Sequence, residues 1–210
     1  DACRDYMYGG WPDGLDEEIA KHVFKLEKAM GRKLGDPFDP LLVSVRSGAK
    51  FSMPGMMDTV LNLGLNDQSV EGLAHSTDDE RFAYDSYRRF IAMYGRIVLG
   101  VDGEPFEHAL DAAKAKAGTS MDNLIPADAL KELCEDYKAI VLKETGSPFP
   151  QKPREQLNGA VEAVFKSWNG ARAIAYRNRE KIDHDLGTAV NVQTMVFGNR
   201  DDNSGTGVGF

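Results

Sequence analysis

An arginine stands at the end of a short apolar segment, where its side chain is suited to bind a phosphate. Arg46 follows the buried-strand pattern LLVSV at 41–45 and precedes the small residues SGA at 47–49. A guanidinium binds phosphate oxygens through two parallel hydrogen bonds, which an ammonium group cannot do. The small neighbours leave room for a ligand to approach. The pattern therefore indicates an anion site at Arg46, and the simpler alternative is a surface ion pair.

The next segment is rich in methionine and has the composition of a loop. Residues 52–59 read SMPGMMDT and show neither a helical nor an alternating period. Gly55 lies between proline and methionine, where a turn would present backbone amides to an anion. Methionine is polarizable and adaptable, so Met56 or Met57 is suited to pack on a flat ring such as adenine. The alternative is that these methionines belong to an ordinary core.

A second candidate for nucleotide binding lies near the end of the chain. Residues 189–197 have strand character, and within them Gln193, Thr194 and Met195 offer backbone groups of the kind that bind adenine. Thr206 lies in the segment SGTG, whose hydroxyls and glycines suit a phosphate. A hairpin turn at 198–205 is the simpler interpretation of this region.

Several other chemistries are not supported by the sequence. The four histidines, His22, His75, His108 and His184, have no metal-ligand spacing with cysteines or carboxylates. The chain contains neither a GxxxxGK[ST] loop nor a nucleophile elbow. One basic cluster and one basic pair are interpreted as solvated faces: Arg172, Arg177, Arg179 and Lys181, and Arg88 with Arg89.

Composition restricts the partners and the compartment. There are 25 Lys and Arg against 33 Asp and Glu, a net charge of −8, which argues against nucleic acid because basic contacts to phosphates dominate that binding. Cys3 and Cys134 form no disulfide framework, so we expect free thiols in a reducing cytoplasm. No apolar run reaches the roughly 20 residues of a membrane span, and no signal peptide is visible.

The remaining periodicity predicts an α+β fold. Apolar residues recur at helical spacing over 15–31, 80–99 and 127–144, and a further helix follows the prolines before 157. The order is helix, strand, loop, a helical insert and then an antiparallel-looking pair at the end. The chain begins without methionine and ends in a glycine-rich segment, so we expect a fragment.

One long stretch resembles a known family. LLVSVRSGAKFSMPGMMDTVLNLGLND at 41–67 is very similar to the nucleotide-binding domain of the pyruvate phosphate dikinase family. The similarity continues through RFAYDSYRRF at 81–90 and the Gly-Ala-Val and Ser-Trp stretch at 159–168. It then runs through GTAVNVQTMVFGN at 187–199 to the final SGTGVGF. It covers essentially the whole chain and is weakest over 100–150.

The resemblance implies an ATP-grasp-like nucleotide-binding domain with a helical subdomain insert. Residues 1–66 would be the remnant of the first lobe, 67–150 the helical subdomain and 151–210 the start of the second lobe. The site residues that it implies are Arg46 on the ATP phosphates, the Gly55 backbone beside it, Met57 on adenine, Gln193, Thr194 and Met195 as the adenine-binding hinge, and Thr206 near the phosphates.

The family reaction converts ATP, inorganic phosphate and pyruvate to AMP, pyrophosphate and phosphoenolpyruvate through a phosphohistidine on another domain. The resemblance also implies Mg²⁺, a cytoplasmic location and a homodimeric parent enzyme. The magnesium ligands, the glycine-rich loop with its lysine, and the histidine and pyruvate domains would all lie outside this chain. We therefore expect the fragment to be inactive and to bind ATP weakly.

Two alternatives remain open at this point. Phosphoenolpyruvate synthase uses water in place of phosphate, and its loop is acidic and contains Phe and Gln, so the methionine-rich loop favours the dikinase. A module that keeps the fold without binding nucleotide is the second alternative. The retention of Arg46 and of the hinge argues against it.

Overall fold

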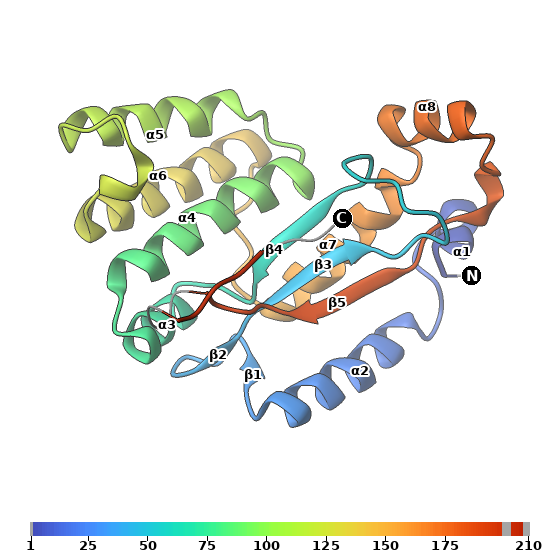
Figure 1. Ribbon diagram of the computed structural model, residues 1–210, viewed down its shortest axis with the longest axis horizontal. Helices are drawn as coiled ribbons and strands as arrows, with labels where there is room; N and C mark the ends of the chain where they lie inside the picture. The colour runs from blue at the N-terminus through green and yellow to red at the C-terminus, as the bar shows by residue number, and fades with distance from the viewer. Residues whose placement is uncertain (1, 199–202, 208–210) are drawn as a thin grey trace.

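The fold combines a small antiparallel sheet with eight α-helices in the part of the chain described by the computed structural model, residues 2–198 and 203–207 (Figure 1). The expected α+β class is confirmed at this level. In chain order the elements are α1 (Ala2–Gly9), α2 (Leu15–Met30), β1 (Lys33–Leu34), β2 (Pro40–Leu41), β3 (Val43–Ser47), β4 (Thr59–Leu63), α3 (Ser69–Thr77), α4 (Glu80–Ile97), α5 (Glu104–Lys116), α6 (Ala127–Thr145), α7 (Pro153–Ser167), α8 (Ala171–Glu180) and β5 (Val190–Thr194), with short 3-10 turns at Asp122–Leu124 and His184–Leu186.

The helices predicted from periodicity are present, and the strands differ in their bounds. The helices expected over 15–31, 80–99 and 127–144 correspond to α2, α4 and α6. The first strand of the sheet begins two residues later than expected, so Arg46 lies within β3 rather than just after a strand. β5 is shorter than the predicted segment 189–197, and β4 was not expected at all. The sequence TVLNL of β4 has no alternation, because its pairing with β3 includes a register shift between Val43 and Val45.

The sheet has the order β4-β3-β5, and both pairings are antiparallel. Figure 1 shows α7 behind the sheet, and the residues of β3 and β4 that face α7 form the core. Val43, Val45 and Val60 are each at most 1% exposed. Since β5 pairs with β3, the strand that follows the helical segment 67–150 completes the sheet begun by the strands before it. The sheet therefore contains strands from both of the outer segments, 1–66 and 151–210.

The helical segment is joined by an ion-pair network around an arginine that the sequence had assigned to a solvated face. Arg88 of α4 is only 5% exposed. Its guanidinium lies 2.6 Å from an oxygen of Asp85 and 3.0 Å from an oxygen of Asp122. The interpretation of Arg88 as solvated was therefore wrong, because two carboxylates compensate the cost of burying its charge. Arg89 is exposed, as expected.

Arg177 of α8 is the second arginine whose predicted exposure was wrong. Its side chain is 1% exposed and lies 4.1 Å from the centre of the Trp168 ring. The guanidinium donates hydrogen bonds to the Trp168 carbonyl and, at 3.0 Å, to Nδ1 of His184. Stacking on an indole and satisfied donors stabilise the buried cation. Arg172, Arg179 and Lys181 are exposed, as expected.

Gln156 of α7 connects the helix to the end of the sheet and to the segment that leads into the helix. The residue is fully buried. Its Nε2 donates to the carbonyls of Leu65 at 2.9 Å and Pro150 at 2.8 Å, and its Oε1 accepts from the amide of Gly64 at 3.3 Å. One side chain thus satisfies three backbone groups in the interior.

Cys134 is expected to resist alkylation in the native protein. Both cysteines are free and buried, and burial raises the pKa of the Cys134 thiol to about 12. At pH 8 only about one such thiol in ten thousand is ionised, and the thiolate is the reactive form. We expect mass spectrometry after iodoacetamide treatment at pH 8 to find Cys134 unmodified in the folded chain and fully modified in denaturant. Rapid modification without denaturant would contradict the burial of this side chain.

No helix within residues 2–198 and 203–207 is both long enough and apolar enough to span a membrane.

Candidate functional site

The sheet has one apolar face and one polar face, and Arg46 lies on the polar face. Val45 belongs to the core, so its neighbour Arg46 projects from the opposite side of the strand, because side chains alternate between the two faces. In the ladder, Arg46 stands beside Thr59 of β4 and Asn191 of β5. Asn191 is exposed and Thr59 is half-buried. Three polar side chains therefore form a row across all three strands.

Arg46 has no bonding partner among the described residues. It is half-buried, and neither a hydrogen bond nor an ion pair is formed by its guanidinium in that part of the chain. Other half-buried arginines of the described chain do have partners, as Arg32 and Arg81 illustrate. The predicted alternative, a surface ion pair at Arg46, is therefore absent from the described residues. A fixed cation without a counter-ion on a polar sheet face is suited to bind an anion.

Close packing of glycine and asparagine shapes the end of β3 next to Arg46. A Cβ on Gly48 would lie 2.7 Å from Nδ2 of Asn191. A larger residue at position 48 would therefore displace the side-chain carboxamide of Asn191. The Gly48 amide donates to the carbonyl of Ala189 at 2.8 Å, which continues the pairing of the two strands for one more residue. The chain then leaves the sheet as the loop that was predicted over 52–59.

The loop contains a turn whose glycine is open to solvent. The amide of Met56 donates to the carbonyl of Met53 at 3.1 Å, and Gly55 within this turn has φ +72°. A Cβ at Gly55 would have open space around it, so the residue is present for its left-handed backbone conformation and not for lack of room. The Met56 amide is already bonded to Met53, so the amide of Gly55 itself is the donor that the exposed turn offers to a ligand.

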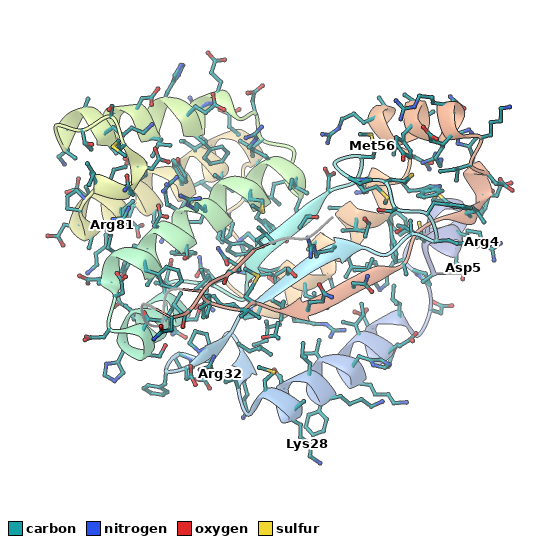
Figure 2. All side chains as sticks on the ribbon, viewed as in Figure 1. Arg4, Asp5, Lys28, Arg32, Met56 and Arg81 are labelled. Atoms are coloured by element: carbon teal, nitrogen blue, oxygen red, sulfur yellow. The ribbon has the colours of Figure 1, made fainter. Side chains whose placement is uncertain are left out.

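The methionines of the loop have different positions. Met53 is 8% exposed and belongs to the core. Met56 and Met57 are half-buried and pack at its margin. Figure 2 shows Met56 on the side of the loop toward α8. There Asp58 lies 3.5 Å from the exposed guanidinium of Arg172, and this ion pair connects the loop to the helix.

The three hinge residues present different groups. Gln193 stands beside Ser44 in the ladder, on the same face as Arg46, and its side chain is exposed. Thr194 pairs with Val43, so its side chain lies on the apolar face, and its hydroxyl donates to the Met195 carbonyl. The Met195 amide donates to the carbonyl of Leu42 at 2.8 Å. By this alternation Gln193 and Met195 share the face of Arg46, and Thr194 does not.

Thr206 lies in the returning segment after β5. Its hydroxyl donates to the carbonyl of Val196 at 3.1 Å, and its backbone is so close to Gly198 that a Cβ there would lie 2.4 Å from the Thr206 amide nitrogen. This close return fits the predicted hairpin, whose tip at 199–202 lies outside the described residues, as does the end of the terminal glycine-rich segment at 208–210. Thr206 itself is exposed.

The structure thus groups Arg46 with Gln193 and adds two neighbours that sequence reasoning missed. Thr59 and Asn191 flank Arg46 because of strand register, and register between strands so distant in sequence has no local signal. Within residues 2–198 and 203–207, no three His, Cys, Asp or Glu side chains gather as metal ligands would.

Comparison with known proteins gives the family of the chain. The family model described as "Pyruvate phosphate dikinase, AMP/ATP-binding domain" matches residues 9–210. The chain is 59% identical over 209 residues to the pyruvate, phosphate dikinase of Giardia intestinalis and 55% identical over 215 residues to that of Clostridium symbiosum. It is 52% identical over 212 residues to the chloroplastic pyruvate, phosphate dikinase 1 of Arabidopsis thaliana.

These matches include at least 99% of this chain and 22–24% of each relative. The chain is therefore related by descent to a nucleotide-binding domain. It spans about a quarter of the length of the curated relatives that it matches. It belongs to the pyruvate phosphate dikinase AMP/ATP-binding domain family.

Proposed function

We propose that this domain binds ATP and AMP, with the phosphates held at Arg46. The observation that carries the proposal is the guanidinium of Arg46, half-buried and unpartnered among the described residues on the polar face of the sheet. The Gly55 turn follows Arg46 in the chain, and the amide of Gly55 is exposed there. Arginine forks and exposed amides are the groups that bind phosphate oxygens in proteins.

The nucleotide would lie along β5, with its base toward Gln193 and its phosphates toward Arg46. Asn191 pairs with Arg46, and Met195 lies four residues further along, about 13 Å at the usual rise of a strand. That separation is comparable with the length of an extended nucleoside triphosphate. The half-buried side chain of Met57 would pack against the base, and the Thr206 hydroxyl would exchange its bond to Val196 for one to the nucleotide.

For the full-length protein we propose the reaction of the family to which the chain belongs. ATP, inorganic phosphate and pyruvate are converted to AMP, pyrophosphate and phosphoenolpyruvate through a phosphohistidine on another domain. Mg²⁺ would neutralise the phosphate charge during transfer, with ligands from outside residues 1–210. The names of the relatives and the methionine-rich loop support this reaction over a water-dependent synthase. Dependence of the forward reaction on inorganic phosphate distinguishes the two.

The architecture that we propose is of the ATP-grasp type, in a cytoplasmic homodimer. Residues 67–150 would form the helical subdomain and 1–66 the remnant of the first lobe, and 151–210 would complete the sheet of that lobe through β5 and lead into the second lobe. The strands of the two outer segments share one sheet, so in this arrangement the polar face around Arg46 is one wall of the nucleotide cleft.

Calorimetry with ATP and Mg²⁺ tests the nucleotide proposal. We expect the full-length protein to bind ATP, and residues 1–210 alone to bind it at least about tenfold more weakly, because charge neutralisation is shared among groups outside this chain. Failure of the full-length protein to bind ATP would show that the family resemblance records ancestry without a working site, as in a non-catalytic module.

A further inference from the structure

A groove of about 830 Å³ separates α2 from the open side of the sheet. One wall is the apolar side of α2: Leu15, Ile19, Val23 and Leu26. The floor includes Val161 and Phe165 of α7, and the other wall is the chain from 187 to 193, which includes most of β5. In Figure 1, α2 runs alongside β5, the strand at whose outer edge no other strand of residues 2–198 and 203–207 pairs.

The helix beside the groove has only part of the packing that normally stabilises an amphipathic helix, since its apolar residues lie partly buried at the margin of the core. None of the 16 residues of α2 is buried, although its apolar residues follow the helical period. No other helix or strand of the described chain packs extensively against it. Helices in proteins are stabilised mainly by tertiary packing of their apolar side. The apolar side of α2 therefore has surface left that a further segment of polypeptide could cover.

The strand on the other wall has an open edge. The Ala189 carbonyl and the Met195 amide both bond to the β3 side, at Gly48 and Leu42. Backbone groups alternate in direction along an antiparallel strand, so the amides and carbonyls of the even-numbered residues Val190, Val192 and Thr194 point toward the groove. An unpaired edge of this kind is a template for another strand.

We propose that a β-strand occupies the groove, and that this strand is formed by the polypeptide immediately preceding residue 1 in the full-length protein. That strand would pair with β5 and cover the apolar side of α2. Two observations select this occupant. The chain covers 24% of the Giardia intestinalis relative, so the full-length protein has further polypeptide to supply. Ala2 lines the groove, so a segment joined to the start of α1 would lie beside the groove. In Figure 1, α1 lies near the start of α2 and the start of β5.

The chemistry of the groove defines the strand. Side chains directed at Val161 and Phe165 must be apolar, and those on the face of Asn191 and Gln193 must be polar, so the segment alternates. The inference concerns the completion of the sheet and does not require ATP to bind.

Photocrosslinking in the full-length protein identifies the occupant. A benzophenone amino acid replaces Val23, which lines the groove, and in a matched control it replaces Ala20, which is exposed on the same helix. We expect irradiation to link position 23 within one molecule to a peptide that precedes residue 1, and position 20 to give no such product. A link to another part of the chain, or between two molecules, would overturn the proposal.

Hydrogen exchange in the unsubstituted full-length protein gives an independent result. If a strand pairs with β5, the amides of Val190, Val192 and Thr194 exchange about a hundredfold or more slower than free amides, as Asn191 and Gln193 do through β3. Exchange of the even-numbered amides at the free rate, with Asn191 protected, would show an open edge and refute the proposal even if position 23 forms a crosslink.

Discussion

Replacement of Arg46 by alanine in the full-length protein lowers kcat/KM for ATP by about 10²–10³-fold, the usual cost of removing one charged or polar donor from a transition state. The guanidinium contributes no bond to the fold of the described residues, so the loss reflects ligand binding and not unfolding. Arg46→Lys keeps the charge but cannot form a bidentate contact, and we expect an intermediate loss. Steady-state kinetics with ATP as the varied substrate measure all three proteins.

The matched control for this experiment is Arg89→Ala. Arg89 is exposed on α4 and pairs with Asp85 at 2.9 Å, far in sequence from the polar face around Arg46. Removal of an exposed ion pair of this kind changes little. Equal losses in the Arg46 and Arg89 variants, or a fall in thermal stability that accounts for the loss in Arg46→Ala, would refute the role of Arg46 in binding phosphate.

Replacement of Gln156 by leucine lowers the free energy of unfolding by about 3 kcal/mol or more, because three backbone groups lose their partner at about 1–3 kcal/mol for each buried group left unsatisfied. These groups are the Gly64 amide and the carbonyls of Leu65 and Pro150. Leucine is close to glutamine in size, so the change isolates hydrogen bonding from packing. For a chain of this length the melting temperature falls by about 6–12 °C.

Gln68→Leu provides the comparison for this second variant. Gln68 precedes α3, is exposed and forms no side-chain cap. The same substitution there should change stability by no more than about 0.5 kcal/mol, as is usual on a surface. Calorimetric melting of the two variants beside the parent chain measures the difference. A Gln156 variant that melts with the parent would mean that water or a rearranged backbone satisfies those three groups.

The sequence predicted those parts of the structure that depend on local patterns. The helices α2, α4 and α6 follow from apolar residues at helical spacing, and Arg46 was selected because an arginine beside small residues after an apolar run is a local signal. The pairing of Arg46 with Thr59 and Asn191 was not predictable, because it depends on the register of strands that are distant in the chain.

Burial of charged residues escaped prediction for a similar reason. Arg177 and Arg179 are both basic residues of one short helix, yet only Arg177 lies against Trp168. In the same way Arg88 is buried between two carboxylates and its neighbour Arg89 is not. Which arginine of a pair faces the interior depends on the rotation of the helix against its neighbours. The positions of basic residues in the sequence do not by themselves determine that rotation.

The central position of β3 has a consequence for synthesis. About 140 residues separate Ser47 of β3 from its partner Val190 of β5. At a rate of synthesis of roughly 5–20 residues per second, β5 is made about 7–30 s after β3. The helices of 67–150 have mainly local contacts and can fold during that interval. β3 and β4 meanwhile form a hairpin with one unprotected edge. The nascent chain is therefore most exposed to aggregation or to chaperone binding after the helices have formed and before the sheet is complete.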